Sequence, residues 1–173
     1  TVNQTPVITS FFAPFCSNDN GLFALSSTPS AVWNGPGVLS TGTSFLFHPL
    51  SAGAGIHTLV ATNATGGCTA SMLVTVYQAP KLVLTTSEPA PVCSPNTVDL
   101  TQLVDQNASI LPPGTIIQYL DPNNSVVLNP SAVSTSGVYR ITAFRPTPDG
   151  NGGGCAATPV HVQVTVNQTP VIT

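Results

Sequence analysis

A nine-residue segment that occurs twice places the strongest constraint on how this chain can fold. Residues 1–9 read Thr-Val-Asn-Gln-Thr-Pro-Val-Ile-Thr, and residues 165–173 are identical to them. The two copies start 164 residues apart in a chain of 173 residues. Self-similarity at a fixed spacing is typical of repeat architectures. We therefore expect one full period followed by the start of the next (residues 167–173), with neighbouring repeats of the same chain as partners.

A weaker copy of the segment divides this period into two halves. Residues 74–82 match residues 164–172 in residue type at nearly every place. Each half also contains one early and one late cysteine. We predict two domains, residues 1–77 and residues 78–166.

Alternation of apolar and polar residues predicts strands. Residues 56–61, 138–143 and 160–166 alternate with the period of two that is typical of half-buried strands. The 17 prolines and 14 glycines interrupt the chain too often for long helices. Further strands are predicted at residues 7–12, 22–25, 31–33, 44–47, 71–77, 81–85, 97–100, 116–120 and 125–128, with one helical turn at 100–106. Many short strands split by turn residues favour an all-β sandwich in each half.

The four cysteines predict two disulfides and an oxidising compartment. Cys16, Cys68, Cys93 and Cys155 form no C-x-x-C motif, which argues against zinc and redox motifs. Four buried thiols are the alternative. Repeat logic favours pairing within halves, Cys16–Cys68 and Cys93–Cys155, because the other two pairings cross halves. In the chain-entropy model each bridge would stabilise its domain by roughly 4 kcal/mol.

Charge excludes several classes of partner. Only 5% of the residues are charged, and the formal net charge is -3. Three Lys and Arg residues cannot neutralise a run of phosphates, so no nucleic acid is expected as a partner. No apolar run approaches the roughly 20 residues that span a bilayer, so no direct membrane insertion is expected. We expect any signal peptide to lie outside this sequence.

Several motifs resemble immunoglobulin-like and PKD-like tandem repeats of Bacteroidota cell-surface adhesins of the gliding-motility type. They comprise residues 16–21, 31–38 (Ala-Val-Trp-Asn-Gly-Pro-Gly-Val), 47–49, 52–57 and 65–69, and residues 136–139 look like the Gly-x-Tyr of a penultimate immunoglobulin-type strand. The resemblance covers almost the whole chain with loose, family-wide motifs. One departure is that the late cysteine does not lie two residues after Tyr139. This departure suggests that the bridge ties one end of a sandwich.

The resemblance implies a fold and a location. The fold is two tandem immunoglobulin-like β-sandwich domains, each with one disulfide. The location is extracellular, on the bacterial outer surface, after export by the type IX route.

Catalytic chemistry has little support in the sequence, and we expect no enzyme. His48, His57 and His161 show no His-x-x-x-His spacing and are interpreted as ordinary strand or edge histidines. No paired carboxylates, nucleophile elbow or phosphate loop is found. No cofactor is expected.

Two candidate ligand sites remain from the residue types alone. Asp19, Asp121 and Asp149 lie beside asparagines that could supply oxygen ligands to calcium. Asx turns explain the same residues without metal, and we favour that interpretation. Trp33 could stack on a glycan, although a core position is favoured.

Three functions follow from these observations. The first is a structural repeat of a secreted adhesin or filamentous stalk that projects a binding tip and mediates attachment or gliding. The second is a module that binds surface glycans or proteins. The third is an accessory domain of a secreted enzyme.

Overall fold

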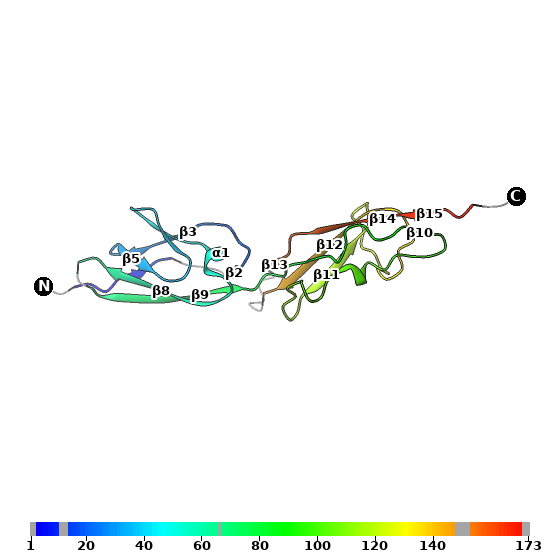
Figure 1. Cartoon of the computed structure of the whole chain (residues 1–173). Helices are drawn as coiled ribbons and strands as arrows, with labels where there is room; N and C mark the ends of the chain where they lie inside the picture. Colours follow the sequence, from blue (N-terminus) through cyan, green and yellow to red (C-terminus); the bar gives the residue numbers. More distant parts are fainter. Residues whose placement is uncertain (1–2, 11–13, 66, 148–152, 171–173) are drawn as a thin grey trace. The chain divides into compact units, whose positions relative to one another are not determined.

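The computed structural model describes residues 3–10, 14–65, 67–147 and 153–170. It divides into two compact units, Thr1–Gln78 and Ala79–Thr173. Figure 1 labels strands of both units. The predicted all-β, immunoglobulin-like class is confirmed.

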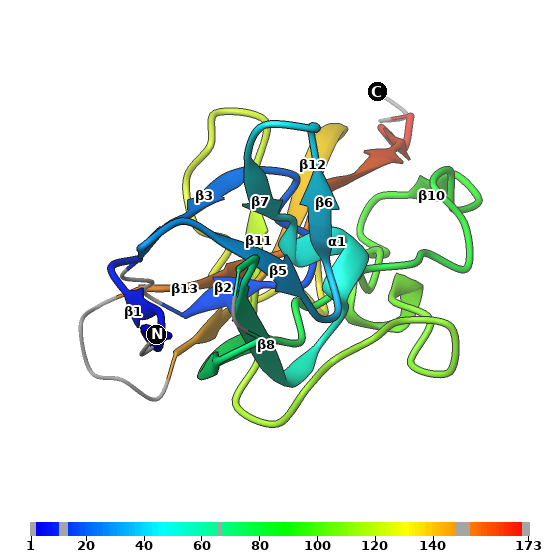
Figure 2. The same cartoon turned by 90° about the vertical axis from the view of Figure 1, so that its left-hand side faces the viewer.

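The first unit consists of two facing sheets and a short helix. One sheet has the order β2 (Phe15–Cys16), β9 (Thr69–Tyr77), β8 (Gly55–Asn63), β5 (Ala31–Asn34), and the other has the order β3 (Phe23–Leu25), β7 (Phe45–Phe47), β6 (Val38–Ser40). β1 (Val7–Ile8) pairs with β4 (Ser27–Thr28), and α1 (Pro49–Ala52) precedes β8. Figure 2 shows β3, β7 and β6 on one side and β5 and β8 on the other. These sets correspond to the B-E-D and G-F-C strands of an immunoglobulin-like sandwich.

The predicted alternation decides which side chains enter this core. On β8, Leu59 and Ala61 are fully buried while Thr58 is exposed. The ring of Phe15 packs 5.4 Å, centroid to centroid, from the ring of the fully buried Phe47. The apolar face of β8 therefore turns inward, as the period of two requires.

The second unit repeats the plan with fewer regular strands. β11 (Ile116–Leu120), β12 (Gly137–Pro146), β13 (Gly154–Ala156) and β14 (Val160–Val164) form one sheet, and β10 (Val92–Cys93) pairs with β15 (Val166–Asn167). The predicted helical turn is a 3-10 turn, η1 (Thr101–Leu103). The core of the second unit includes the fully buried side chains of Ile141, Val162 and Val164.

Three strands predicted in the second unit are reduced to isolated bridges. Residues 81–85 contribute two isolated bridges, and residues 97–100 and 125–128 contribute one each, such as Val98 to Val133. Among the described residues, none of these segments forms a longer ladder. The side-chain oxygen of Ser109 accepts the backbone N–H of Val83 at 2.9 Å. A hydroxyl in the place of a backbone acceptor interrupts the regular ladder.

One parallel pairing is the same in both units. Cys16 of β2 is the register partner of Tyr77, and Cys93 of β10 is the register partner of Asn167. The next residue donates its N–H to the same partner's carbonyl: Ser17 to Tyr77 at 2.8 Å, and Ser94 to Asn167 at 2.9 Å. In each unit an early two-residue strand, β2 or β10, is thereby held on the last strand of that unit.

A second shared feature closes the turn before the penultimate strand. The hydroxyl of the buried Tyr139, in the Gly-x-Tyr motif, donates to the carbonyl of Thr135 at 3.0 Å, which forms a tyrosine corner. In the first unit, His57 Nε2 donates to the carbonyl of Gly53 at 2.8 Å, over the same separation of four residues. Histidine therefore takes the place of tyrosine at this corner.

The predicted disulfide pairing is wrong. Cys16 and Cys155 are disulfide-bonded, whereas Cys68 and Cys93 are thiols, so neither Cys16–Cys68 nor Cys93–Cys155 forms. In the first unit, Cys16 pairs with Tyr77 at one end of β9, and Cys68 immediately precedes Thr69 at the other end. A strand of nine residues spans roughly 26 Å, whereas bridged Cα atoms lie about 4.4–6.8 Å apart.

The second unit separates its cysteines in the same way. Cys155 pairs with Arg145 near the end of β12, while Gly137 at the start of β12 pairs with Val164. Cys93 pairs with Asn167, which lies beyond Val164 on that far side. The length of β12 therefore keeps the two cysteines apart, and the prediction of one internal disulfide in each domain is corrected.

We expect Tyr139→Phe to lower the free energy of unfolding by about 0.5–1.5 kcal/mol, because it deletes the corner hydrogen bond inside a buried site. Denaturant unfolding with near-ultraviolet circular dichroism measures the change. Tyr119→Phe is the matched control, since no hydrogen bond of its hydroxyl is among those described, and it should stay within about 0.5 kcal/mol. Equal effects of the two substitutions would contradict a structural role of the corner.

Candidate functional site

The three histidines are separate and each is explained locally. His48 bonds through Nδ1 to the hydroxyl of Ser51 at 2.6 Å and through Nε2 to the side-chain oxygen of Asn20 at 2.9 Å. His57 serves the corner described above, and His161 is exposed on β14. The described residues contain no group of three or more His, Cys, Asp and Glu side chains that could hold a metal ion.

The calcium candidates form Asx turns where they are described. Asp19 Oδ1 accepts the N–H of Gly21 at 2.8 Å. Asp121 Oδ1 accepts the N–H groups of Asn123 and Ser125, both at 2.8 Å. Asp149 lies outside the described residues. The favoured interpretation of Asp19 and Asp121 as turn residues therefore agrees with their hydrogen bonds.

Trp33 is a core residue and offers no stacking platform. Its side chain is 4% exposed and belongs to the same cluster as Phe47 and Leu59. The glycan-stacking interpretation of Trp33 is therefore wrong, because a sugar ring needs an accessible aromatic face.

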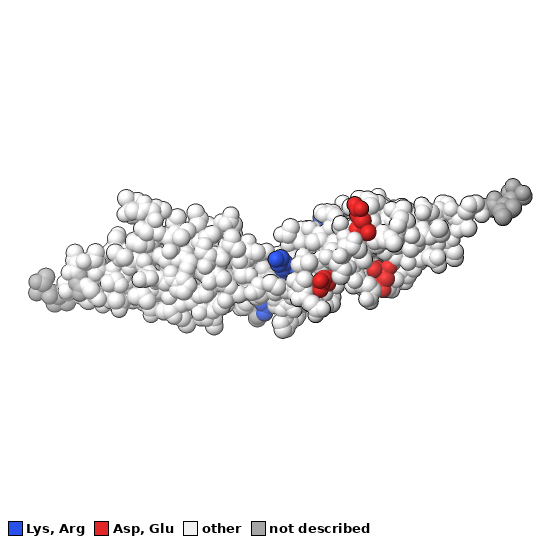
Figure 3. All heavy atoms as spheres, viewed as in Figure 1, with Lys and Arg blue, Asp and Glu red and all other residues white. Residues whose placement is uncertain are grey.

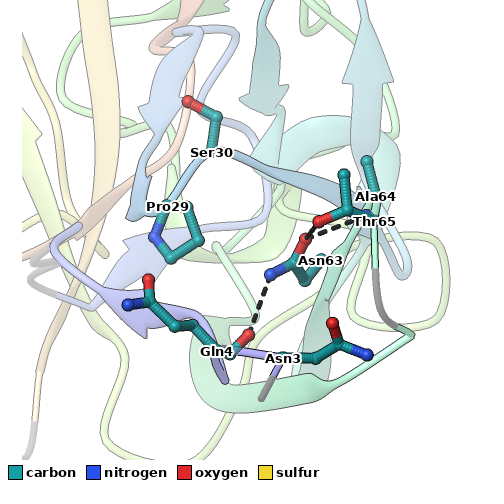
Figure 4. Close-up of a pocket in the computed structure, with 7 residues that line it drawn as sticks. All are labelled: Asn3, Gln4, Pro29, Ser30, Asn63, Ala64 and Thr65. Atoms are coloured by element: carbon teal, nitrogen blue, oxygen red, sulfur yellow. Dashed lines mark hydrogen bonds between the residues drawn. The ribbon is translucent and has the colours of Figure 1, made fainter. Parts of the chain in front are cut away.

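The strongest candidate site is an open hollow at the end of the first unit that holds the repeated segment (Figure 4). Its volume is about 610 Å³. Its lining is uncharged and consists of Asn3, Gln4, Pro29, Ser30, Asn63, Ala64 and Thr65. These residues come from the N-terminal segment, from the turn between β4 and β5, and from the turn after β8.

Asn63 is the residue that organises this hollow. It is the buried polar side chain that closes β8, at 7% exposure. Its Nδ2 donates to the carbonyl of Gln4 at 2.8 Å, and its Oδ1 accepts the N–H and the hydroxyl of Thr65 at 3.0 and 2.9 Å (Figure 4). A buried amide whose ends are both bonded holds the incoming chain against the turn.

Sequence reasoning missed this role of Asn63. Residues 63–65 fit the N-glycosylation pattern, which predicts an exposed asparagine. The same Asn-x-Thr spacing also suits an Asx turn, in which the asparagine oxygen accepts the N–H two residues later. That local signal could have identified the turn, but nothing local predicts the bond to Gln4, which lies 59 residues away.

Cys68 lies at the same end of the unit. Its thiol donates to the carbonyl of Asn3, with Sγ 3.7 Å from the oxygen, and its own carbonyl accepts the N–H of Asn63 at 2.9 Å. Both side chains therefore contact the first residues of the repeated segment. This end of the unit is built to receive that segment.

The chemistry available at this surface is neutral. Asp19 is the single charged residue between Thr1 and Gln78. Figure 3 accordingly shows the face of the first unit with almost no charged atoms. Amide and hydroxyl groups can bind a peptide backbone or sugar hydroxyls, but they cannot neutralise a phosphate.

In the second unit, one phenol is held neutral. Burial, and then the negative charge of Asp99, raise the pKa of Tyr119 above its usual value.

The described helices include none that is long and apolar enough to cross a membrane.

Comparisons with known proteins give similarities to solved structures alone. No protein-family model and no curated protein matches the chain. The chain is similar to the solved structure of the insect immune protein hemolin, at 16% identity and a TM-score of 0.46, with 94% of this chain and 47% of that chain covered. It is also similar to extracellular domains 3-5 of Drosophila OTK, at 16% identity and a TM-score of 0.41, with 94% and 60% covered.

A third similar structure is human protocadherin-24 EC1-2, at 14% identity and a TM-score of 0.33, with 98% and 100% of the two chains covered. The chain thus spans about half the length of the hemolin structure and three fifths of the OTK structure.

We expect Asn63→Ala to destabilise the first unit by about 1–3 kcal/mol, because it leaves the Gln4 carbonyl and the Thr65 N–H without their partner. Hydrogen exchange at residues 3–8 should accelerate together with the loss of stability. The exposed Asn34 of β5 supplies the control, Asn34→Ala, which should leave that exchange unchanged. Unchanged exchange in Asn63→Ala would show that the amide does not hold the segment.

Proposed function

We propose that this chain is a structural repeat unit of a secreted, cell-surface adhesin or stalk. The observation that carries the proposal is the position of the repeated segment. Its first copy runs past Asn63 and ends in β1, at the entry of the first unit, and its second copy contains β15, the last strand of the second unit. One segment of this sequence can therefore end one period and begin the next.

The passage between the two halves supports a spacer role. Tyr77 ends β9, the two units divide after Gln78, and Ala79 and Pro80 are already buried. Buried residues directly after a strand leave no room for a flexible Gly/Ser linker. Pro80 also fixes its own φ and biases the residue before it to extended geometry.

The location follows from the covalent chemistry. A disulfide persists in oxidising compartments, which supports an extracellular protein. The proposal extends to a bacterial outer surface, to export by the type IX route and to attachment or gliding motility, all supported by the sequence resemblance alone. It includes no enzymatic activity, because the described side chains of Asp19, His57 and Asp121 bond the backbone of their own turns and corners.

We expect the maximum dimension of the protein to grow in proportion to the number of periods. Chains of one, two and four periods, measured by small-angle X-ray scattering, test this expectation. Folded chains that pack into one globule would instead grow as roughly the 0.38 power of length. Such weak growth would refute the spacer function.

A binding module is the second candidate, and the neutral hollow at Asn63 favours it. Binding of glycans or peptides there should be insensitive to salt, because no lining residue is charged. Ser30→Arg would fill the hollow from its exposed rim, and Ser71→Arg on β9 is a matched control outside it. Glycan-array binding that is lost in the first variant and kept in the second would establish this function. Equal binding by both variants would rule out the hollow as a binding site.

A further inference from the structure

Two cysteines stay reduced while their equivalents are bonded. The disulfide-bonded cysteines are Cys16, the early cysteine of the first unit, and Cys155, the late cysteine of the second. The thiols are the late cysteine of the first unit, Cys68, and the early cysteine of the second, Cys93. The early position therefore has a bonded sulfur in the first unit and a thiol in the second, and the late position has the reverse.

Cys93 has the same backbone environment as the bonded Cys16. Both precede a serine whose N–H bonds the last strand of the unit, at 2.8 Å for Ser17 and 2.9 Å for Ser94. The carbonyl of each cysteine also closes a turn: Cys16 accepts the N–H of Asp19 at 3.0 Å, and Cys93 accepts an N–H three residues later at 2.9 Å. Cys93 is exposed, so its sulfur is accessible to a partner.

Cys93 and Cys68 contact equivalent residues of the two copies of the repeated segment. In the second unit, Asn167 is the register partner of Cys93, and its carbonyl accepts the N–H of Ser94. In the first unit, the carbonyl of Asn3 accepts the thiol of Cys68, at 3.7 Å. Asn3 and Asn167 are the third residues of the two identical copies.

The two sets of contacts are compatible on one segment. A carbonyl oxygen has two lone pairs and can accept both the Ser94 N–H and the Cys68 thiol. The remaining contacts use different residues of the segment. The hydroxyl of Thr169, its fifth residue, donates to the carbonyl of Ser94, while Asn63 bonds the carbonyl of Gln4, its fourth. A segment that makes all these contacts brings both cysteines to one asparagine.

We propose that Cys93 of each period forms a disulfide with Cys68 of the following period. This inference rests on the tandem arrangement in the proposed function and adds a covalent link between periods. Each thiol loses one proton and one electron as the S–S bond forms. A disulfide oxidant, such as oxidised glutathione, takes up both electrons and both protons and is reduced to two thiols.

The test uses a chain of two periods, in which residues 1–164 precede residues 1–173, purified as a monomer after equilibration with a mixture of reduced and oxidised glutathione, in which the reduced form returns isolated cysteines to thiols. The inner variant carries Cys68→Ser in the first period and Cys93→Ser in the second. Besides Cys16 and Cys155 of each period, it keeps Cys93 of the first period and Cys68 of the second, which flank the boundary between periods. We expect no thiol to react with a maleimide mass tag in denaturant. Non-reducing peptide mapping should show Cys93 linked to Cys68.

The outer variant is the matched control, with Cys93→Ser in the first period and Cys68→Ser in the second. It has the same number and type of substitutions, and both of its thiols should react. Two reactive thiols in a folded inner variant, or its recovery only as covalent dimers, would overturn the inference. Scattering on the reduced chain separates the two proposals, because an extended array without the link refutes only the disulfide.

Discussion

The structure depends on the parallel pairing of an early, two-residue strand with the last strand of each unit. β2 lies on β9 and β10 lies on β15, in the same register and with the same serine N–H bond to the last strand. This pairing places residues from the start and the end of a unit side by side. It also fixes the early cysteine at the end of the unit where the chain leaves.

Aspartate side chains complete several turns of the second unit by accepting nearby hydrogen bonds. Asp99 accepts the N–H and hydroxyl of Thr101, and Asp105 accepts the N–H groups of Asn107 and Ala108. These carboxylates therefore act as local acceptors of backbone hydrogen bonds. Such bonds are made within two or three residues, so they do not depend on ionic contacts between strands.

Features set by nearby residues could be predicted from the sequence, whereas features set by distant ones could not. The alternation in β8 and β12 predicted their buried faces, and the Gly-x-Tyr motif was matched to the strand that contains Tyr139. Residues 81–85 form isolated bridges in place of the expected regular strand, and the sequence could not predict this outcome. The N–H of Val83 bonds the hydroxyl of Ser109, which lies 26 residues away, in place of a backbone acceptor. The bond from Asn63 to Gln4 was missed for the same reason, although Asn63 itself matched a local motif.

The cysteines show why equivalence in sequence does not determine partners. The repeat correctly identified one early and one late cysteine in each half, yet a pairing within halves assumed that the two lie near each other. A nine-residue strand in the first unit and a ten-residue strand in the second separate them. In an immunoglobulin-like sandwich whose cysteines lie at opposite ends of the long strands, internal bridging is excluded by strand length. Each sulfur must then either stay reduced or find its partner outside its own unit.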